Sequence, residues 1–327
     1  MQRPLLICLT PVKNEAWILQ AFLQAASLWA DYIIIADQGS TDGSREIALE
    51  YPKVILIDNN TPDFNEADRQ RLLINRAREI EGDKILFALD ADEILSANFA
   101  ITQDWQKILH SKPGDVFWFR WANLYPDMHH YWPSEIYFPW MFHDDGIEPH
   151  GNYVRNIHSM RIPYPIEEKQ MYYVNDFHVL HFAYVYPNRV AAKMRFYKFT
   201  DLTINNRNPI TLSRFYKNCI PALSSNRISL PDNYINFGFD LLAKIERHND
   251  SFWFDSYIAN HINNDNYDQI CKIDIWEEPL LSQIAKFDHR TILIRVVHYY
   301  LEITKQIANY KIIKLTDKIL SKLKILG

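Results

Sequence analysis

The chain has 327 residues, of which 48% are hydrophobic and 14% aromatic, and it carries a formal net charge of −5. This length suffices for one large domain or for a domain with an extension. The negative charge does not favour nucleic acid as a partner, and the sequence has no run of about 18 apolar residues that would predict a membrane span.

The cysteines and the N-terminus both fit a cytoplasmic location. Cys8, Cys219 and Cys271 are scattered without the spacing of a metal site, so we interpret them as reduced thiols. The short apolar run near the start of the chain is typical of a first strand rather than of a signal peptide.

The first hundred residues alternate short apolar runs with helical patterns. We predict strands at 5–9, 31–37, 54–58 and 85–89. We predict three helices. The first covers about 16–30 and has Asn14 as a candidate cap; the second runs to about residue 50 and has Ser40 or Thr41 as its cap; the third covers about 66–80. Strands that alternate with helices of this length imply βαβ units and a parallel sheet with helices on its faces.

The fourth predicted strand ends in three carboxylates within four residues, Asp90, Asp92 and Glu93. Ligands of open α/β sheets bind beyond the carboxyl ends of the strands. Carboxylates crowded there repel one another unless a cation lies among them. The pattern therefore indicates a site for Mg²⁺ or Mn²⁺ together with a bound phosphate. The alternative is a solvated turn that begins a helix.

The pattern changes after Ile94. We predict one further strand at Asp115–Trp121, and then a loop-rich, aromatic stretch at 122–185. Eight of the twelve histidines lie between His110 and His181. This stretch suits a polar-aromatic cleft for sugar rings, and an ordinary surface layer is the alternative. We expect a helix at about Asn188–Asp201 and a mostly helical chain from about residue 209 onward.

The tail from Thr291 is predicted to form a long helix. On a helical wheel, Lys311, Lys314, Lys318 and Lys322 make one stripe beside apolar positions. Such a helix can lie on an anionic membrane surface. Packing on the helix's own domain or on a second subunit remains the alternative.

Three segments, taken together, resemble glycosyltransferase family 2, and each follows a predicted strand. They are Thr10-Pro11-Val12-Lys13-Asn14-Glu15, Asp37-Gln38-Gly39-Ser40-Thr41-Asp42-Gly43-Ser44 and Leu89-Asp90-Ala91-Asp92-Glu93. The resemblance implies a GT-A fold, a Rossmann-like, mostly parallel sheet flanked by helices. We expect this domain at 1–205, with a nucleotide-sugar half at about 1–100 and an acceptor half at about 101–205. A helical C-terminal extension would occupy 206–327.

The resemblance also implies roles on the donor side. Asp92 would bind the metal, Asp90 would lie nearer the ribose and donor sugar, and Asp37 would accept a hydrogen bond from the base. The loop after the first strand would line the nucleotide pocket through Pro11, Val12, Asn14 and Glu15. Arg69 and Arg71 stand where the family places a basic side chain near the nucleotide, and a solvated helix face is their alternative.

The family inverts the anomeric centre, which requires a general base on the acceptor side. Our candidates are Asp145, favoured over Asp144, and then Glu148, although the Glu-Asp pair that many members carry is missing here. His158 and His181 are candidates to complete the metal shell or to bind phosphate, and a structural role is the alternative for each.

We therefore predict a Mn²⁺- or Mg²⁺-dependent hexosyltransferase that moves a sugar from a nucleoside diphosphate to a hydroxyl of a glycan or glycolipid. The resemblance is to the bacterial branch that builds lipopolysaccharide and other cell-surface polysaccharides. We expect the protein in the cytoplasm, with the inner face of the membrane as a further location. The alternatives are a metal-dependent phosphotransferase or phosphatase, and a non-catalytic nucleotide-sugar-binding protein.

Overall fold

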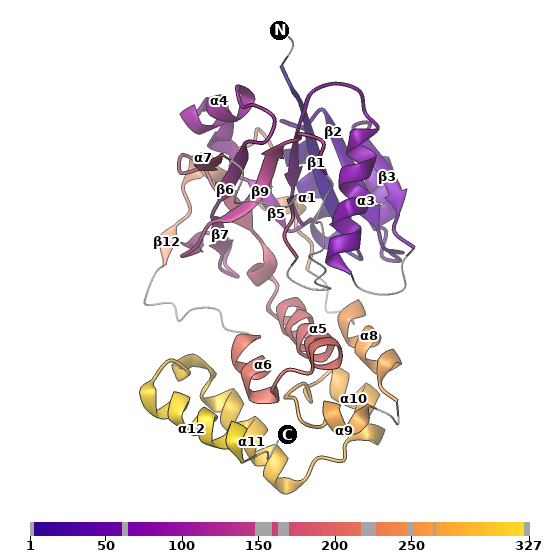
Figure 1. Cartoon of the computed structure of the whole chain (residues 1–327), viewed down its shortest axis with the longest axis vertical. Coiled ribbons are helices and arrows are strands. Elements are labelled where there is room, and N and C mark those ends of the chain that lie inside the picture. The colour runs from indigo at the N-terminus through magenta and orange to yellow at the C-terminus, as the bar shows by residue number, and fades with distance from the viewer. Residues whose placement is uncertain are drawn as a thin grey trace. The chain divides into compact units, whose positions relative to one another are not determined.

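The structure, a computed structural model, describes residues 3–60, 65–147, 159–162, 170–216, 227–247, 252–263 and 266–323. The chain forms two compact units. Unit 1 comprises Met1–Val185 and Arg227–His248, and unit 2 comprises Tyr186–Asn226 and Asn249–Gly327 (Figure 1).

Unit 1 is built on a seven-stranded sheet with the order β10-β6-β9-β4-β1-β2-β3. Its strands are β1 (Leu5–Val12), β2 (Tyr32–Asp37), β3 (Val54–Asp58), β4 (Lys84–Ala88), β6 (Val116–Phe119), β9 (Phe138–His143) and β10 (Met171–Tyr173). The four strands from β1 to β4 are parallel. Strand β9 runs antiparallel to both β4 and β6, and β10 is parallel to β6.

The parallel strands are apolar runs; β1, β2 and β4 are largely buried, whereas the edge strand β3 is partly buried. Residues Ile33–Ile35 and Ile85–Phe87 have no exposed surface. Helices α1 (Ala16–Ala26), α2 (Ser44–Leu49) and α3 (Glu66–Arg78) connect the strands, and α1 and α3 lie on opposite faces (Figure 1). Right-handed crossovers require this arrangement, since the chain reverses direction across the sheet between β3 and β4. The predicted fold class, including the helical C-terminal region, is confirmed.

A second, five-stranded sheet of unit 1 has the order β12-β8-β7-β11-β5. Its strands are β5 (Glu93–Leu95), β7 (Trp121–Leu124), β8 (His130–Pro133), β11 (Val179–His181) and β12 (Ile228–Ser229). The prediction of one strand at Asp115–Trp121 is wrong, because the chain leaves the first sheet at Arg120. The β6–β9 register shifts at Phe117/Trp118, and such irregularities bend a strand and increase its twist.

The remaining helices of unit 1 are short: η1 (Ala97–Ile101), α4 (Gln103–Leu109), η2 (Ala183–Val185), α7 (Asp232–Ile235) and η3 (Leu242–Lys244). Unit 2 is helical, with α5 (Pro187–Asn205), α6 (Pro209–Phe215), α8 (Trp253–His261), α9 (Tyr267–Ile270), α10 (Leu280–Ile284), η4 (Ala285–Phe287), α11 (Ile292–Ile303), η5 (Lys305–Ile307) and α12 (Lys311–Lys322). Arg195 of α5 donates two hydrogen bonds of 2.8 Å to buried Asp255 of α8.

Two features of unit 2 differ from our expectations. Helix α5 groups with unit 2 and residues 227–248 return to unit 1, so the compact units do not divide at residue 205, and that domain boundary stays a prediction. The prediction of a single long helix from Thr291 onward is wrong, because α11 and α12 are separate helices. Arg214 donates to the carbonyl of Leu301 at the end of α11, at 3.1 Å, and thereby satisfies a group that a continuing helix would use.

Within the described residues, no helix has the length and apolar character needed to cross a membrane.

Candidate active site

The loops after β1, β2 and β4 meet at one edge of the first sheet. In the parallel register Val12 lies beside Asp37, and Leu9 lies beside Ala88. The carboxyl ends of these strands therefore share an edge, which is where open α/β sheets bind ligands.

Asp37 ends β2 with a side chain that is 1% exposed. Its Oδ2 accepts hydrogen bonds from the backbone N–H of Ser40 at 3.1 Å and from Arg45 at 2.7 Å. Its Oδ1 is buried and has no hydrogen-bond partner in the part of the chain that the structure describes. Buried polar atoms without partners are costly in proteins. This oxygen is therefore a candidate to accept a hydrogen bond from a bound molecule, for example from the N–H of a nucleobase.

The loops after β1 and β2 hold each other. The backbone N–H of Asn14 donates to Ser40 Oγ at 2.9 Å, and the Asn14 side-chain oxygen accepts from the N–H of Thr41 at 2.8 Å. Asn14 adopts a positive φ of 55°, so it does not cap α1 as we expected. Asp42 instead accepts from the N–H of Ala16 at 3.0 Å. The interlocked loops fix the position of Asp37 relative to β1.

The carboxylates that follow β4 are held by an arginine that we did not predict. Arg161 donates to Asp90 Oδ2 at 2.7 Å and to both oxygens of Glu93, at 2.5 and 3.2 Å. Glu93 is fully buried, and it also accepts from the N–H of Asp90 and from Trp121 Nε1, both at 2.8 Å. Burial raises the pKa of Glu93 to about 7, and the charge of Arg161 opposes that rise. Glu93 therefore ties the acidic turn to the second sheet.

A pocket opens at this edge between β1, α3 and the segment 159–162. It is lined by Leu9, Pro11, Glu66, Arg69, Gln70, Ala88, Leu89, Asp90, Ser159, Met160 and Arg161. The structure thus brings together three of the predicted donor-side residues, Pro11, Arg69 and Asp90. The backbone N–H of Ser159 donates to Glu66 at 3.0 Å, which anchors the segment to the start of α3.

Other predicted donor-side residues do not line this pocket. Val12 is 3% exposed and lies in the core, while Glu15 accepts from Trp17 Nε1 at 2.8 Å. Arg71 pairs with Asp68 one turn before it, at 2.5 Å, which fits the solvated helix face that we gave as its alternative. The roles of these residues in donor binding remain predictions.

The predicted metal ligands lie in and beside the acidic turn. Asp92 is 3% exposed, and its carbonyl accepts from the N–H of Phe182 at 2.8 Å. The neighbouring His181 stacks on Trp121 with ring centroids 4.6 Å apart, and its Nδ1 lies 2.8 Å from the side-chain oxygen of Asn123. His158 lies outside the described residues. Strand pairing thus places His181 next to the acidic turn.

The side chains of this turn fit a divalent ion whose coordination is completed by a bound phosphate compound and water. Among the described residues, no group of three or more His, Cys, Asp or Glu side chains could hold a metal alone. Mg²⁺ sites of phosphate-handling enzymes use one or two carboxylates and complete the shell with phosphate and water. Asp90 and Asp92 can supply such a partial set of hard oxygen ligands.

Asp144 and Asp145, our candidates for the acceptor-side base, do not line this pocket, and their role remains a prediction. Asp144 accepts from Arg78 Nε at 3.1 Å and Nη2 at 2.8 Å, and its own N–H donates to the carbonyl of Lys84. Because β9 runs antiparallel to β4, its end lies beside the start of β4, at the edge opposite to Asp90. Asp145 follows directly and is exposed, so neither acid borders the pocket. Glu148 lies outside the described residues.

Arg161 and Glu93 are the site residues that our reasoning missed. Glu93 was counted among the three acids but received no role. The signal for Arg161 was a single charge between Met160 and Ile162, and Ile162 is completely buried. An arginine embedded in such a segment usually has a buried carboxylate partner, and the acidic turn was the available one.

Comparison with known proteins agrees with the motifs. Residues 8–162 match the family model described as glycosyl transferase family 2. This range begins in β1 and ends directly after Arg161, so it contains every residue that lines the pocket. No curated protein matches the chain.

Solved structures give weaker likenesses. Glucosyl-3-phosphoglycerate synthase from Mycobacterium tuberculosis, in complex with Mn²⁺, UDP and glucosyl-3-phosphoglycerate, is 18% identical over 38% of this chain and 44% of that chain, with a TM-score of 0.27. The same enzyme with Mg²⁺ and UDP is 19% identical over the same shares, with a TM-score of 0.27. A 4-diphosphocytidyl-2C-methyl-D-erythritol synthase is 10% identical over 44% of this chain and 75% of that chain, with a TM-score of 0.32. The chain spans less than half of the length of the mycobacterial synthase.

Proposed function

We propose that this protein is a metal-dependent glycosyltransferase that moves a sugar from a nucleoside diphosphate to a hydroxyl acceptor. The observation that carries the proposal is the coincidence of the family 2 match with the pocket. The matched range supplies the interlocked loops, the acidic turn and the arginines at the carboxyl edge of the sheet. That edge is the ligand site of open α/β folds.

The geometry of the donor-side residues supports a proposed role for each of them. Asp37 Oδ1 accepts a hydrogen bond from the nucleobase, because the carboxylate is fixed by Ser40 and Arg45 through its other oxygen. Arg69 lines the pocket and suits a diphosphate, since a guanidinium binds phosphate oxygens in a bidentate manner. Pro11 also lines the pocket.

The acidic turn is the metal-binding part of the proposal. Asp92 and Asp90 would hold Mn²⁺ or Mg²⁺, with His181 as a further candidate ligand. The ion would neutralise the charge that builds on the leaving diphosphate. Arg161 holds Asp90 in place at 2.7 Å, and because Glu93 fixes Arg161, the turn keeps one conformation before the donor binds.

The acceptor side is proposed to lie toward the second sheet. Trp121, Phe138 and Trp140 form an aromatic cluster there, with ring centroids 4.3–5.2 Å apart, and Arg161 lies over Trp140 at 5.4 Å. Trp121 and Phe138 are partly exposed, and aromatic faces suit the apolar faces of sugar rings. A hexose donor and an acceptor of the lipopolysaccharide or cell-surface polysaccharide type remain part of the proposal, supported only by the motif resemblance.

A donor-turnover assay tests the function. The purified protein is incubated with a panel of nucleotide sugars and Mn²⁺, and the released nucleoside diphosphate and inorganic phosphate are measured separately. We expect slow release of the diphosphate from one donor and its loss in Asp90→Asn. Asp144→Asn is the matched control, since Asp144 follows β9 and its N–H donates to Lys84 at the start of β4, at the end of that strand opposite to Asp90. Release of inorganic phosphate would support a phosphatase instead, and no turnover with undiminished binding would support a binding protein.

A further inference from the structure

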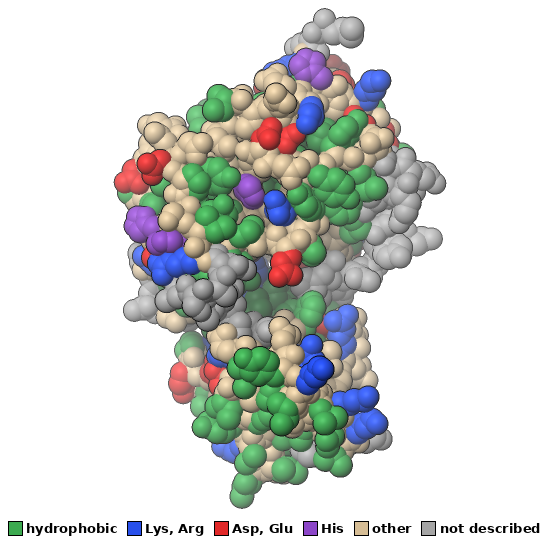
Figure 2. All heavy atoms as spheres, turned by 90° about the vertical axis from the view of Figure 1, so that its left-hand side faces the viewer, with side chains coloured by type: hydrophobic (Ala, Val, Ile, Leu, Met, Phe, Trp, Pro, Cys, Tyr) green, Lys and Arg blue, Asp and Glu red, His purple; other side chains and the backbone are tan. Residues whose placement is uncertain are grey.

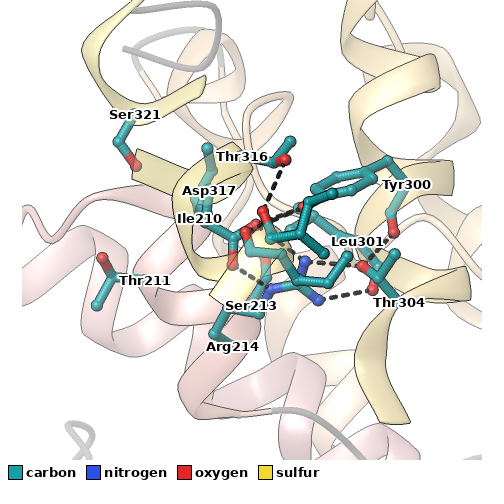
Figure 3. A network of polar contacts seen from close by, with 12 residues as sticks. Ile210, Thr211, Ser213, Arg214, Tyr300, Leu301, Thr304, Thr316, Asp317 and Ser321 are labelled. Atoms are coloured by element: carbon teal, nitrogen blue, oxygen red, sulfur yellow. Dashed lines mark hydrogen bonds and ion pairs between the residues drawn. The ribbon is translucent and has the colours of Figure 1, made fainter. Parts of the chain in front are cut away.

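The two C-terminal helices pack inward on α6 through a small, specific set of contacts. Val297 and Leu301 of α11 are buried against Ile210, and Ile313 is the buried position of α12. Arg214 of α6 binds both oxygens of Asp317 at 2.9 Å and the hydroxyl of Thr304 at 2.7 Å, and Tyr300 donates to Asp317 at 3.0 Å (Figure 3). These contacts fix which sides of α11 and α12 face outward.

The outward sides are apolar, although nothing in the described chain covers them. We call this surface the outer face of the C-terminal helices. Its apolar members are between 48% and 83% exposed, and they are Ile292, Val296, Tyr299 and Ile303 of α11, Ile312, Leu315 and Ile319 of α12, and Leu323 directly after α12. They recur at the three-, four- and seven-residue spacing of one helix side. Figure 2 shows hydrophobic side chains gathered on this side of unit 2, with lysine and arginine side chains at the border.

A row of lysines runs along the same face. Lys311, Lys314, Lys318 and Lys322 are all exposed, and none forms an ion pair with another described residue. Asp317, the acidic residue of α12, points inward to Arg214. The exposed side of α12 is therefore purely basic and apolar, in a chain whose net charge is −5.

We propose that the outer face of the C-terminal helices binds the surface of an anionic lipid bilayer. Helices that lie in a membrane interface combine an apolar side with flanking lysines, because the apolar side enters the acyl boundary while the ammonium groups reach the lipid phosphates. The lysine row provides charge complementarity to such a surface. A second copy of the chain is a poorer occupant, since a twofold contact through this face would bring the lysine rows of the two copies together.

The inference is independent of the enzymatic proposal, and vesicle flotation of the full chain tests it. The vesicles contain phosphatidylcholine alone or phosphatidylcholine mixed with phosphatidylserine, at low and high salt. We expect binding only to the anionic vesicles, weakened by salt because surface charges are screened. Lys314→Gln with Lys318→Gln should weaken binding about 25-fold, since each lysine near an anionic surface contributes roughly a fivefold factor.

A second pair of variants tests the apolar contribution. Leu315→Gln with Ile319→Gln should weaken binding by about tenfold or more at either salt concentration. The matched control is Leu49→Gln with Ile101→Gln, because these apolar residues of unit 1 are also exposed, at 71% and 87%. Circular dichroism should show that all variants are folded, since every substituted side chain is exposed.

Three results would overturn the inference. They are the absence of binding to anionic vesicles, equal binding to neutral and anionic vesicles, and equal loss of binding in the control pair. Sedimentation equilibrium adds a fourth. A wild-type dimer that becomes a monomer in Leu315→Gln with Ile319→Gln, without any vesicle binding, would assign the face to contact between copies.

Discussion

Replacing Arg161 by methionine should destabilise unit 1, because it removes the cation beside a buried carboxylate. Glu93 has no exposed side-chain surface, and Arg161 approaches it at 2.5 Å. Removing one partner of a buried ion pair typically costs about 3–5 kcal/mol. Glu93 retains its hydrogen bonds from the N–H of Asp90 and from Trp121, so we expect the lower end, about 3 kcal/mol. The lost contact with Asp90 adds little because Asp90 is 33% exposed.

A double-mutant cycle separates this pair from its surroundings. Glu93→Gln alone should cost about 1–3 kcal/mol, since it leaves Arg161 facing a neutral group. The double variant should cost less than the sum of the single variants by about 1–3 kcal/mol, as expected for two groups in direct contact. Arg76→Met is the control, because Arg76 forms an exposed pair with Glu79 one turn away, and such pairs contribute about 0.5 kcal/mol.

Urea unfolding followed by circular dichroism measures these changes, with the midpoint and the slope determined separately for each variant. Burial raises the pKa of Glu93 to about 7 although the charge of Arg161 lowers it. Loss of Arg161 should therefore raise this pKa further, and the destabilisation should be measured at neutral and at mildly alkaline pH, with the larger cost expected at the higher pH. A loss in Arg161→Met no larger than that in Arg76→Met, or strictly additive losses in the double variant, would refute the role that we give to this pair.

Three further predictions follow from the site and its surroundings. Asp37→Asn should weaken nucleotide binding about tenfold or more, whereas Asp31→Asn, at the other end of β2, should not, as calorimetric titration can show. Asp144→Asn should lower the free energy of unfolding by about 1–3 kcal/mol, because the charge-assisted pair with Arg78 is lost. Donor turnover of this variant should stay at the wild-type rate, and a large loss of turnover would show that Asp144 belongs to the active site. Burial and the charge of Arg120 lower the pKa of His178 from 6.5 to about 4. Between pH 4 and pH 6.5 the unfolded state therefore binds more protons than the folded state. Stability should fall by roughly 2 kcal/mol from pH 6.5 to pH 4, and thermal unfolding of His178→Gln should show a smaller fall.

The sequence predicted the first half of unit 1 well, because its signals are local. Ile33, Ile34 and Ile35 lie in a run that only a strand buried on both faces explains, and the structure buries all three completely. The segment Val54–Asp58 was predicted with the bounds that the structure shows. Capping was less predictable, since Asp42 reaches α1 from a different loop.

The rest of unit 1 was harder to predict because its signals are not local. No residue of β9 reveals that the strand runs antiparallel to β4, and this direction alone moves Asp144 to the opposite edge. The break at Arg120 likewise depends on a change of sheet, which the aromatic residues on both sides of Arg120 conceal. The partnership of Arg161 with Glu93 joins residues 68 positions apart, so spacing could not show it.

In the C-terminal tail, the sequence predicted one feature correctly and missed another. The lysine stripe at Lys311, Lys314, Lys318 and Lys322 was visible from periodicity, and all four side chains are exposed. The break between α11 and α12 was not visible, because it depends on Arg214 of α6 reaching the end of α11. Helix periodicity shows which residues share a side, whereas the end of a helix can depend on a distant partner.

Calorimetric titration with nucleoside diphosphates in the presence of Mn²⁺ tests the central claim most directly. We expect one of UDP, GDP, CDP or dTDP to bind the wild-type protein more tightly with Mn²⁺ than without it. Binding of that nucleotide should be weakened in Asp37→Asn, and its dependence on the ion should be lost in Asp92→Asn. If none of the four binds with or without the ion, or if both variants bind as the wild type does, the pocket beside Asp90 is not a nucleotide-sugar site.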